Sequence, residues 1–320
     1  MIIGNFIKEI ELKYKNHYFS DICFDSSKCK KDNIFFAIKG TKIDGNKFIN
    51  YAIQKGAKTI VSNQKIEGIK NNILFIKSSN VRKSLSEFAY KIYKEKPKNI
   101  IAVTGTNGKS SVADFYFQIL KFNKRKVASI GTLGVKTQNY IKKLSNTTMN
   151  PNALGMILNK LKKEKIDDVI LEASSHGLKQ NRLDGLKFNT GIFTNLSHDH
   201  LDYHRTFSDY LKSKLYLFKK LLKKNANIIT DIEIPQYRKI KEIALKNKIN
   251  IETISNNNSN LEIIFHEYHN EKQIVKIKYN KKIYKFETRL IGKIQIKNIL
   301  MAMIAATKSG LSFKKIINTI

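Results

Sequence analysis

The sequence predicts an α/β protein: a small N-terminal α/β domain, followed by a P-loop domain with a doubly wound, mostly parallel sheet and added antiparallel strands. Three observations predict this class. Apolar runs of strand length alternate with stretches of helical periodicity over most of the chain. A strand, a glycine turn and a helix beginning near Lys109 follow one another in the layout that binds phosphates. A charged segment with a proline, 94–98, lacks apolar periodicity and divides the chain.

The first domain is expected at residues 1–96. Its expected elements, in chain order, are strands at 33–38, 59–61 and 72–76, and helices at 48–55 and 81–93. The two cysteines of the chain, Cys23 and Cys29, also lie here. The five residues between them fit neither a metal motif nor a redox motif, so we expect reduced structural thiols.

The second domain is expected at residues 97–320 and begins with repeated strand–helix units. Its first expected elements are strands at 99–103, 126–130, 168–172 and 188–193, and helices from Lys109 and at 153–164. Such alternation predicts right-handed crossovers and a parallel sheet, whose ligands bind beyond the carboxyl ends of the strands. The glycine turn, Glu172 and the segment 195–200 all fall at that edge. Their convergence is the main physical argument for an active site.

The last third of the chain has a different pattern. Its expected elements are strands at 227–231 and 250–253, helices at 236–247 and 298–309, and the start of another helix before Ile320. Residues 261–290 alternate apolar and polar side chains, with turns at 269–270 and 279–280. This alternation predicts antiparallel strands laid on the edge of the sheet.

The glycine turn is the clearest functional signal. It has the sequence Gly105-x-x-Gly108-Lys109-Ser110, a shorter variant of the usual loop, because Val103 stands where the first glycine is expected. Glycines let backbone N–H groups approach phosphate oxygens, the start of the helix favours the anion, and the lysine adds a positive charge. Nucleotide binding is therefore predicted. The alternative is a glycine turn with a chance Gly-Lys pair.

Acidic and histidine side chains supply candidate metal ligands. Glu172 ends its strand and can hold Mg²⁺ against nucleotide phosphates, or it can be an acid near the start of a helix. The segment 197–204 contains three of the seven histidines and two aspartates. Its spacing repeats no known zinc pattern, so a Mg²⁺ site with one histidine ligand is favoured over a zinc site.

The composition limits the other classes of function. The net charge of +33 invites a nucleic-acid interpretation, but only six of the 59 Lys and Arg residues are Arg, and the lysines are spread along the whole chain. We expect no specific nucleic-acid partner. Residues 1–15 are interrupted by charges, and no apolar run is about 18 residues long, so neither a signal peptide nor a membrane span is expected. The predicted location is cytoplasmic.

Several longer motifs together resemble the Mur ligase family. They are GTNGKSS at 105–111, NTT at 146–148, EASSHGLKQNRLDG at 172–185, FTNLSHDHLDYH at 193–204 and YLKSKLYLF at 210–218, with DSS at 25–27, FFAIKG at 35–40 and DGNKF at 44–48. The resemblance covers nearly the whole chain. It implies ATP-dependent amide ligation in peptidoglycan precursor synthesis: a substrate carboxylate attacks the γ-phosphate, and an amine then displaces phosphate from the acyl phosphate.

The 172–185 block and the first domain favour the branch of the family that adds the third stem-peptide amino acid to UDP-MurNAc-L-Ala-D-Glu. The implied cofactors are ATP and Mg²⁺, and the implied partners are UDP-MurNAc-L-Ala-D-Glu and an amino acid, diaminopimelate or lysine. A monomer is expected. The family also has a C-terminal domain that binds the amino acid, and the resemblance implies that this domain is absent from the sequence.

The resemblance assigns roles by position. Catalytic roles fall on Lys109, Glu172, His200 and Lys214; ATP binding falls on Gly105, Thr106, Asn107, Gly108, Lys109, Ser110, Ser111 and Asn298; substrate binding falls on Ser26, Asn146, Thr147, Thr148, Ser174, Gln180 and Arg182. The implied metal ligands are Ser110, Glu172, His200 and Lys214, the last as a carbamate formed with CO2. A carbamate turns a cationic side chain into an anionic ligand.

The sequence departs from the family at several positions. Ser27 stands where arginine is usual, Gln295 stands where asparagine is usual, and Pro151 does not follow Thr148 directly. Three other functions stay open. They are a binding-only fragment that holds ATP and UDP-MurNAc-dipeptide, a sibling ligase of the Mur or folylpolyglutamate type, and a nucleic-acid-dependent P-loop ATPase.

Overall fold

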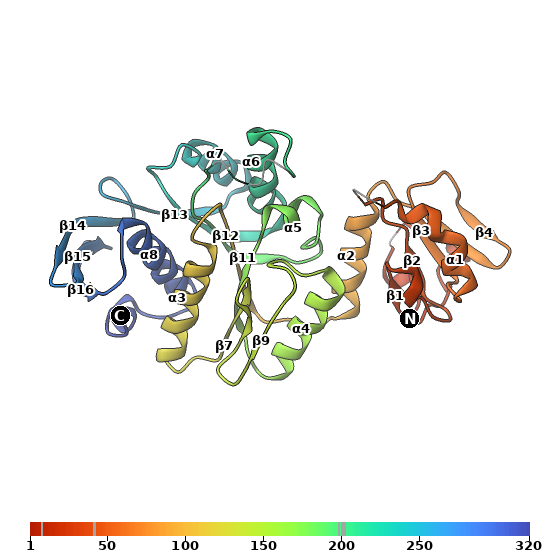
Figure 1. Ribbon diagram of the computed structural model, residues 1–320, viewed down its shortest axis with the longest axis horizontal. Helices are drawn as coiled ribbons and strands as arrows, with labels where there is room; N and C mark the ends of the chain where they lie inside the picture. Colours follow the sequence, from red (N-terminus) through yellow and green to blue (C-terminus); the bar gives the residue numbers. More distant parts are fainter. Residues whose placement is uncertain (8, 41–42, 198, 200–202) are drawn as a thin grey trace. The chain divides into compact units, whose positions relative to one another are not determined.

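The computed structural model describes residues 1–320 except 8, 41–42, 198 and 200–202. These residues form two compact units (Figure 1). The N-terminal unit comprises residues 1–94 together with 180–185, and the central unit comprises residues 95–179 and 186–320. Both units combine helices with a mostly parallel sheet, which confirms the predicted fold class.

Within its described residues, the N-terminal unit has one 5-stranded sheet with the order β1-β2-β3-β5-β4. All neighbours are parallel except β4, which pairs antiparallel with β5 at one edge. The strands are β1 (Ile22–Cys23), β2 (Ile34–Phe36), β3 (Thr59–Ser62), β4 (Gly68–Lys70) and β5 (Ile73–Lys77); the α-helices are α1 (Ile49–Gln54) and α2 (Val81–Ile92); the 3-10 turns are η1 (Ile3–Asn5), η2 (Leu12–Tyr14), η3 (Ser26–Lys28) and η4 (Gly45–Phe48).

The sheet of the N-terminal unit has an apolar core on each face, because successive strand residues point to opposite faces. In β2, Ile34 and Phe36 belong to a cluster with Phe88 of α2. Phe35 between them belongs to the other cluster, with Ala52 of α1. Residues 180–185, which also belong to this unit, are hydrogen bonded to α2. Ser86 Oγ donates to Asn181 O, and Tyr90 OH donates to Arg182 O.

The central unit has, in the part that the structure describes, an 11-stranded sheet with the order β16-β15-β14-β13-β12-β11-β6-β10-β7-β8-β9. Its strands are β6 (Asn99–Thr104), β7 (Val127–Gly131), β8 (Gly134–Lys136), β9 (Ile141–Lys142), β10 (Asp168–Glu172), β11 (Phe188–Phe193), β12 (Leu222–Asp231), β13 (Asn250–Ser255), β14 (Leu261–His269), β15 (Lys272–Tyr279) and β16 (Lys282–Thr288). Its helices are α3 (Lys109–Phe122), α4 (Pro151–Lys163), α5 (Ser175–Lys179), α6 (Phe207–Tyr216), α7 (Tyr237–Asn247), α8 (Lys293–Lys308), α9 (Phe313–Ile317) and the π-helical turn η5 (Leu217–Leu221).

The middle of this sheet is parallel and buried on both faces, as parallel sheets require. Every residue of β10 is buried, and so is every residue of β6 after Asn99. Helices α3 and α8 pack side by side (Figure 1), and α3 also packs on β6, β7 and β10. The carboxyl ends of β6, β7, β10 and β11 therefore meet at one edge, directly before the glycine turn, Thr132, Ala173 and Thr194.

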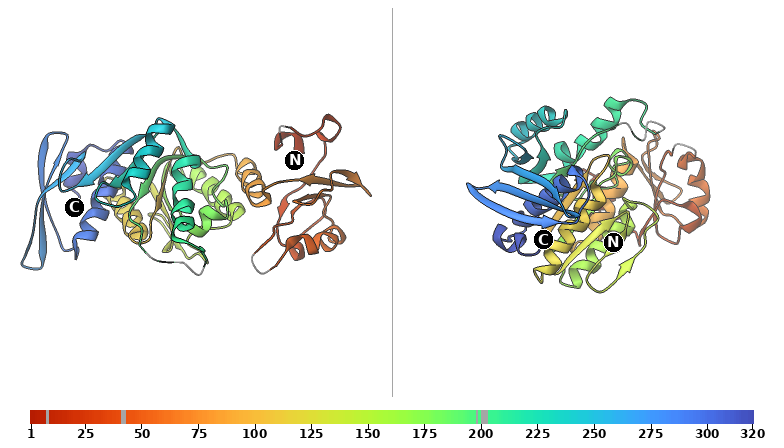
Figure 2. Two further views of the ribbon diagram at one scale, coloured as in Figure 1. Left: turned by 90° about the horizontal axis from the view of Figure 1, so that it is seen from above. Right: turned by 60° about the vertical axis from the view of Figure 1, so that its left-hand side comes forward.

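Antiparallel strands extend the sheet at both ends. Strands β14, β15 and β16 project from one edge of the central unit (Figure 2), which confirms the expectation for 261–290. At the other end, β8 and β9 pair antiparallel beyond β7. The sequence did not predict this second pair, because β8 and β9 are short and β9 is exposed rather than apolar and buried.

Two predicted boundaries in this unit are wrong. Helix α8 begins at Lys293 rather than at 298, because Gly292, with φ of +87°, ends the preceding segment and occupies the N-cap position. Strand β12 begins at Leu222 rather than at 227, and its exposed polar residues Lys224 and Asn225 interrupt the apolar run that predicts strands.

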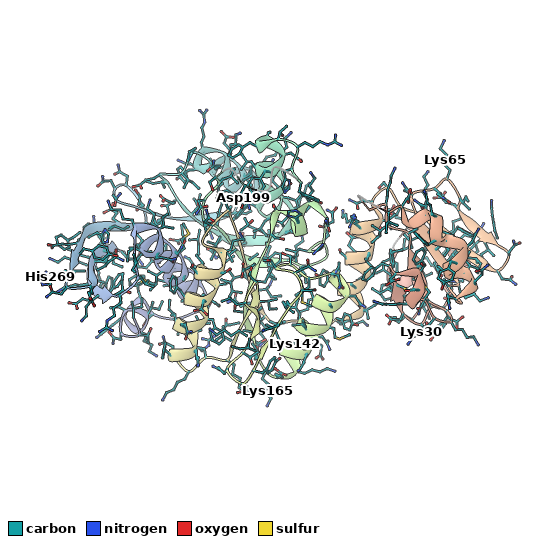
Figure 3. All side chains as sticks on the ribbon, viewed as in Figure 1. Lys30, Lys65, Lys142, Lys165, Asp199 and His269 are labelled. Carbon is teal, nitrogen blue, oxygen red and sulfur yellow. The ribbon has the colours of Figure 1, made fainter. Side chains whose placement is uncertain are left out.

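No helix in the described part of the chain combines the length and apolar character that crossing a bilayer requires. Exposed lysines occur on both units (Figure 3). Lys30 and Lys65 are examples from the N-terminal unit, and Lys142 and Lys165 are examples from the central unit. Positively charged side chains are therefore exposed on the surfaces of both units.

Candidate functional site

The glycine turn forms a tight loop between β6 and α3. Gly105 has φ of +150° and Gly108 has φ of +86°, values that L side chains rarely adopt. A Cβ on Gly105 would lie 1.9 Å from Thr194 Oγ1, and a Cβ on Gly108 would lie 2.5 Å from Asn298 Oδ1. Both positions therefore require glycine. Helix α3 begins at Lys109 after a glycine N-cap with no side-chain oxygen, which leaves its first backbone N–H groups for an anion.

Lys109 folds back over the loop that precedes it. Its Nζ donates to Gly105 O at 3.0 Å and to Thr106 O at 2.7 Å. Burial lowers the pKa of Lys109, while the negative charges of Glu172 and Asp199 oppose this shift. Asp199, labelled in Figure 3, follows β11. The ammonium group is therefore held on two carbonyl oxygens that a phosphate group can replace.

Glu172 is the centre of a buried polar network at the end of β10. Its side chain is buried, and the carboxylate accepts from Ser110 Oγ at 2.9 Å, Thr132 N at 2.9 Å and Thr132 Oγ1 at 3.1 Å. Gly131 makes room for it, since a Cβ there would lie 2.1 Å from Glu172 Oε1. Two strand ends and the first turn of α3 thus hold one carboxylate.

Lys214 of α6 is a second buried lysine at the loop. It is 1% exposed, its Nζ donates to Gly105 O at 2.6 Å, and it lies 4.4 Å from the ring centroid of Tyr210. Burial, and then the positive charge of Lys109, lower the pKa of Lys214 to about 6, against the opposing charge of Asp199. Near neutral pH a large share of this lysine is a neutral amine, which is the nucleophilic form.

The segment after β11 closes the other side of the loop. Thr194 Oγ1 donates to Asn107 O at 2.6 Å. The side-chain amide of Asn195 donates to Asn107 O and accepts from Asn107 N. Thr106 Oγ1 lies 3.1 Å from Tyr210 OH. The loop is therefore held by partners from the segment after β11 and from α6.

These groups line one pocket of about 260 Å³ in the central unit. The lining residues are Thr106, Asn107, Gly108, Lys109, Ser110, Ser111, Thr132, Thr147, Glu172, Ser174, Ser175 and Lys214. The pocket combines two lysines, one carboxylate, several hydroxyls and the start of a helix. This set suits a polyanion bound together with a hard cation.

Three other residues predicted to bind substrate lie at or beside this pocket. Thr147 lines it, and its Oγ1 lies 3.0 Å from Thr132 Oγ1. Thr148 is buried behind it: its Oγ1 donates to Glu172 O and accepts from Ser174 N, both at 2.9 Å. Thr148 therefore joins the end of β10 to the segment that carries Ser174, whereas Asn146 is exposed.

The remaining predicted residues of this unit are placed as follows. Asn298 is buried in α8, contacts the glycine turn at Gly108, and donates to Gln295 Oε1 at 3.2 Å. His200 lies outside the described residues, so its predicted role as a metal ligand stays a prediction.

Ser26, Gln180 and Arg182 belong to the N-terminal unit. Gln180 Oε1 accepts from Arg182 Nε at 3.1 Å and from its terminal nitrogen at 2.8 Å. Ser26 lines a pocket of about 740 Å³ within this unit, which we call the N-terminal pocket. Its other lining residues are Phe24, Asp25, Ser27, Phe35, Ile38, Ile43, Gly45, Phe48, Tyr51 and Arg82. Aromatic side chains beside polar groups suit a planar, polar ligand such as a base.

Sequence reasoning missed Thr132 and Tyr210. Thr132 follows a glycine at the end of β7, on the same sheet edge as the glycine turn, and this position was an available signal. Tyr210 precedes Lys214 by four residues, so both lie on one face of α6. That signal becomes useful only once Lys214 is known to face the loop.

A buried histidine lies beside α6. His204 is 0% exposed, its ring centroid is 5.0 Å from that of Tyr210, and neither ring nitrogen has a hydrogen-bond partner among the described residues. Burial and then the charges of Lys179 and His176 lower the pKa of His204 to about 4, and Asp209 opposes them. This histidine is neutral at physiological pH.

The described residues include no group of three or more His, Cys, Asp and Glu side chains arranged for a metal ion. The Glu172 carboxylate and the Ser110 hydroxyl, 2.9 Å apart, nevertheless present oxygen ligands to the pocket. Such a partial set fits Mg²⁺, which is usually bound by one or two protein oxygens together with phosphate oxygens and water.

Comparison with known proteins identifies the family. Residues 103–306 match the Mur ligase middle domain, and residues 19–97 match a family described as Mur ligase family, catalytic domain. The chain belongs to the Mur ligase family. This confirms the resemblance drawn from the motifs.

Two curated relatives illustrate the similarity, both named UDP-N-acetylmuramoyl-L-alanyl-D-glutamate–2,6-diaminopimelate ligase. The protein from Rickettsia montanensis is 35% identical over 311 residues, which cover 96% of this chain and 64% of the relative. The protein from Agrobacterium fabrum is 34% identical over 289 residues, which cover 90% of this chain and 58% of the relative. The chain thus spans less than two thirds of the length of these relatives.

Solved structures agree with this result. A structure of a UDP-N-acetylmuramoyl-L-alanyl-D-glutamate–2,6-diaminopimelate ligase has a TM-score of 0.88 and 25% identity, covering 99% of this chain and 66% of that chain. The MurF ligase from Thermotoga maritima in complex with ADP has a TM-score of 0.59 and 18% identity, and the match covers 93% of this chain and 65% of that chain. The second similarity is one of fold.

Proposed function

We propose that this chain supplies the ATP-binding and UDP-MurNAc-binding parts of a ligase that adds the third stem-peptide amino acid to UDP-MurNAc-L-Ala-D-Glu. The observation that carries the proposal is the central pocket, where Lys109, Lys214 and Glu172 meet at the start of α3. The names of the relatives support diaminopimelate as the amino acid, and lysine is the alternative. In this proposal, residues 1–96 bind the UDP-MurNAc portion and residues 97–320 bind ATP.

The proposed ATP site uses the glycine turn and the start of α3. Backbone N–H groups, Ser110 and Ser111 hold phosphate oxygens, with Asn298 behind Gly108 supporting the turn. Lys109 exchanges its two carbonyl acceptors for a phosphate oxygen, because a hydrogen bond between two charged groups is about twice as strong as a neutral one. Its charge matters most when negative charge builds up on the γ-phosphoryl group.

The proposed Mg²⁺ ligands are Ser110, Glu172, His200 and Lys214, the last after its amine reacts with CO2 to give a carbamate. Bound Mg²⁺ supplies Lewis-acid polarisation of phosphate oxygens. The lowered pKa of Lys214 supports the carbamate, because only the neutral amine reacts with CO2 and burial favours that form. The hydrogen bonds from Thr132 that hold the Glu172 carboxylate support its role in this proposal.

The proposed substrate contacts extend from this pocket. Thr147 and Ser174 line it beside Glu172, which supports delivery of the substrate carboxylate to this point. Asn146, Gln180 and Arg182 are proposed contacts for the rest of the dipeptide and sugar. Ser26 in the N-terminal pocket is proposed to contact the uridine, whose flat ring suits the aromatic lining.

The test measures ADP formation by this chain with Mg·ATP and UDP-MurNAc-L-Ala-D-Glu, with and without diaminopimelate or lysine. We expect this nucleotide dipeptide to stimulate ADP formation, and UDP-MurNAc-tripeptide, folate and nucleic acid to have no effect. Stimulation by the tripeptide would point to a sibling Mur ligase, and stimulation by folate would point to the folylpolyglutamate type. Stimulation by DNA or RNA would overturn the proposal. Tight binding of ATP and the nucleotide dipeptide without ADP would mean a binding-only role.

A further inference from the structure

Cys23 and Cys29 lie closer together than their spacing in the sequence suggests. Cys23 ends β1, and Cys29 directly follows the 3-10 turn η3. The turn reverses the chain, since the Cys29 backbone N–H donates to Ser26 O. Both side chains are buried in one apolar cluster with Phe35, close enough for each thiol to shift the pKa of the other. The five intervening residues therefore form a small loop closed by two sulfur atoms.

Cys23 is also bound to the loop that follows it. Cys23 Sγ donates to Asp25 O at 2.8 Å. The neighbouring Cys29 thiol lowers the pKa of Cys23, because a donor stabilises the Cys23 thiolate, and the Cys23 sulfur in turn raises the pKa of Cys29. The pair thus contains one sulfur disposed to attack and one neighbour able to resolve the product.

The loop between these sulfurs is a wall of the N-terminal pocket. Phe24, Asp25, Ser26 and Ser27 all line that pocket, and so does Phe35, the strand partner of Cys23. The turn is capped internally, since the Asp25 carboxylate accepts from Ser27 N at 3.1 Å and from Ser27 Oγ at 2.7 Å. A change at either end of this loop is passed directly to the pocket wall.

We propose that Cys23 and Cys29 are an oxidisable thiol pair whose disulfide reshapes the 24–27 wall of the N-terminal pocket and weakens ligand binding there. The oxidant is a small disulfide such as oxidised glutathione. Cys23, as thiolate, attacks one sulfur of the oxidant, forms a mixed disulfide and releases one thiolate. Cys29 then loses its proton to water, attacks the Cys23 sulfur and releases the second thiolate. The protein loses two electrons and two protons, which end on two glutathione thiols.

Two consequences of the bond explain the reshaping. A disulfide has no S–H, so Asp25 O loses the donor that it has in the reduced protein. The two sulfurs must also approach to about 2.05 Å, well inside any hydrogen-bonded separation, which draws together the two ends of the loop. Access to the thiols requires opening only the short segment 24–28, whose residues are exposed or half-buried.

The first test follows the bond itself and needs no ligand of the pocket. The chain is equilibrated in glutathione buffers of increasing oxidised fraction and analysed by mass spectrometry without reduction. We expect a species lighter by two hydrogen atoms, with Cys23 linked to Cys29 in the peptide map, and its reversal by dithiothreitol. The variants Cys23→Ser and Cys29→Ser should give mixed glutathione adducts only. Adducts without the internal bond in the native sequence, or no oxidation, would overturn the proposal.

The second test measures the pocket, and this part rests on the proposed function. Binding of UDP to the oxidised chain should be about fivefold to tenfold weaker than to the reduced chain, since one wall has lost a hydrogen bond. The double variant Cys23→Ser/Cys29→Ser should bind equally well in both buffers. Equal UDP binding by the oxidised and the reduced native chain would overturn the proposal that the disulfide weakens binding in the N-terminal pocket.

A chain that binds no UDP when reduced would contradict the proposed function, not the thiol pair. Hydrogen exchange of the Ser27 and Cys29 backbone amides then tests whether oxidation reshapes the 24–27 wall. Both amides are hydrogen bonded inside the loop, so we expect their exchange rates to change on oxidation. Unchanged rates in the oxidised chain would show that the wall does not move.

Discussion

The pocket of the central unit and the N-terminal pocket differ in how their walls are held. In the central unit, hydrogen bonds from α3 and from the end of β7 converge on Glu172, and Lys214 reaches the same loop from α6. In the N-terminal unit, the polar groups of the wall come mainly from the turn 24–27, and most other lining residues are apolar. A wall held by several elements moves only with the sheet, whereas a wall made of one turn can move alone. The wall of the first pocket is therefore expected to be rigid, and the wall of the second to move more easily.

The sharpest way to separate the two pockets is to remove the loop lysine. Lys109→Ala deletes the cation that faces the proposed γ-phosphoryl group. We expect ATP turnover to fall at least about 1,000-fold, in the range seen when one electrostatic group of an active site is lost. UDP binding to the N-terminal pocket should be unchanged, and both quantities can be measured on the same preparation. Lys121→Ala, an exposed lysine at the other end of α3, is the matched control and should change neither. Equal loss of both activities would contradict the division of roles.

The next largest effect should come from pH, through His204 beside α6. Its pKa in the folded chain is about 4, below the ordinary value of 6.5, so between these values the unfolded chain binds more protons. Stability should therefore fall as pH decreases from 6.5 to 4, and this histidine should account for about 3 kcal/mol of that fall. Denaturant unfolding across this range is compared between the native chain and His204→Phe. The stability of the native chain relative to His204→Phe should fall steadily with decreasing pH, and a pH-independent difference would argue against a buried neutral histidine.

How much of each pocket the sequence predicts depends on how local its parts are. The glycine turn and Glu172 were predicted, because each lies directly after an apolar strand and parallel strands bring their carboxyl ends together. Thr132 and Tyr210 were missed, since each matters through a partner on another element. Motif patterns describe neighbours in sequence, and these two contacts join residues far apart along the chain.

The N-terminal pocket was harder to predict for the same reason. The Asp-Ser-Ser segment alone is a common turn, and its significance depends on Phe48 and Arg82 lying across from it. The spacing of Cys23 and Cys29 predicts only reduced structural thiols, because the 3-10 turn between them has no strong sequence signal. The edge strands β8 and β9 were missed because they are too short and too exposed to show a pattern.

A smaller effect should come from crowding the carboxylate of the central pocket. In Gly131→Ala the new Cβ would lie 2.1 Å from Glu172 Oε1, so the side chain must shift. We expect a loss of about 2 kcal/mol in unfolding free energy, typical of overpacking, and weaker Mg·ATP binding. A double-mutant cycle with Glu172→Ala identifies the cause, because Gly131→Ala should cost much less once the carboxylate is gone. Equal costs in both backgrounds would mean that backbone strain, not the carboxylate, sets the effect.

The smallest effect should come from the N-terminal pocket, whose polar wall is mainly one turn. Ser26→Ala removes one hydroxyl from the lining. One neutral hydrogen bond contributes about 0.5–1.5 kcal/mol, so UDP binding should weaken by roughly threefold to tenfold and ATP binding should be unchanged. Ser20→Ala is the control, since Ser20 donates to Lys31 O in the same unit and lies outside the lining residues. A loss as large as that expected for Lys109→Ala would show that this turn is as rigid and as central as the glycine loop, and the contrast between the two pockets would have to be given up.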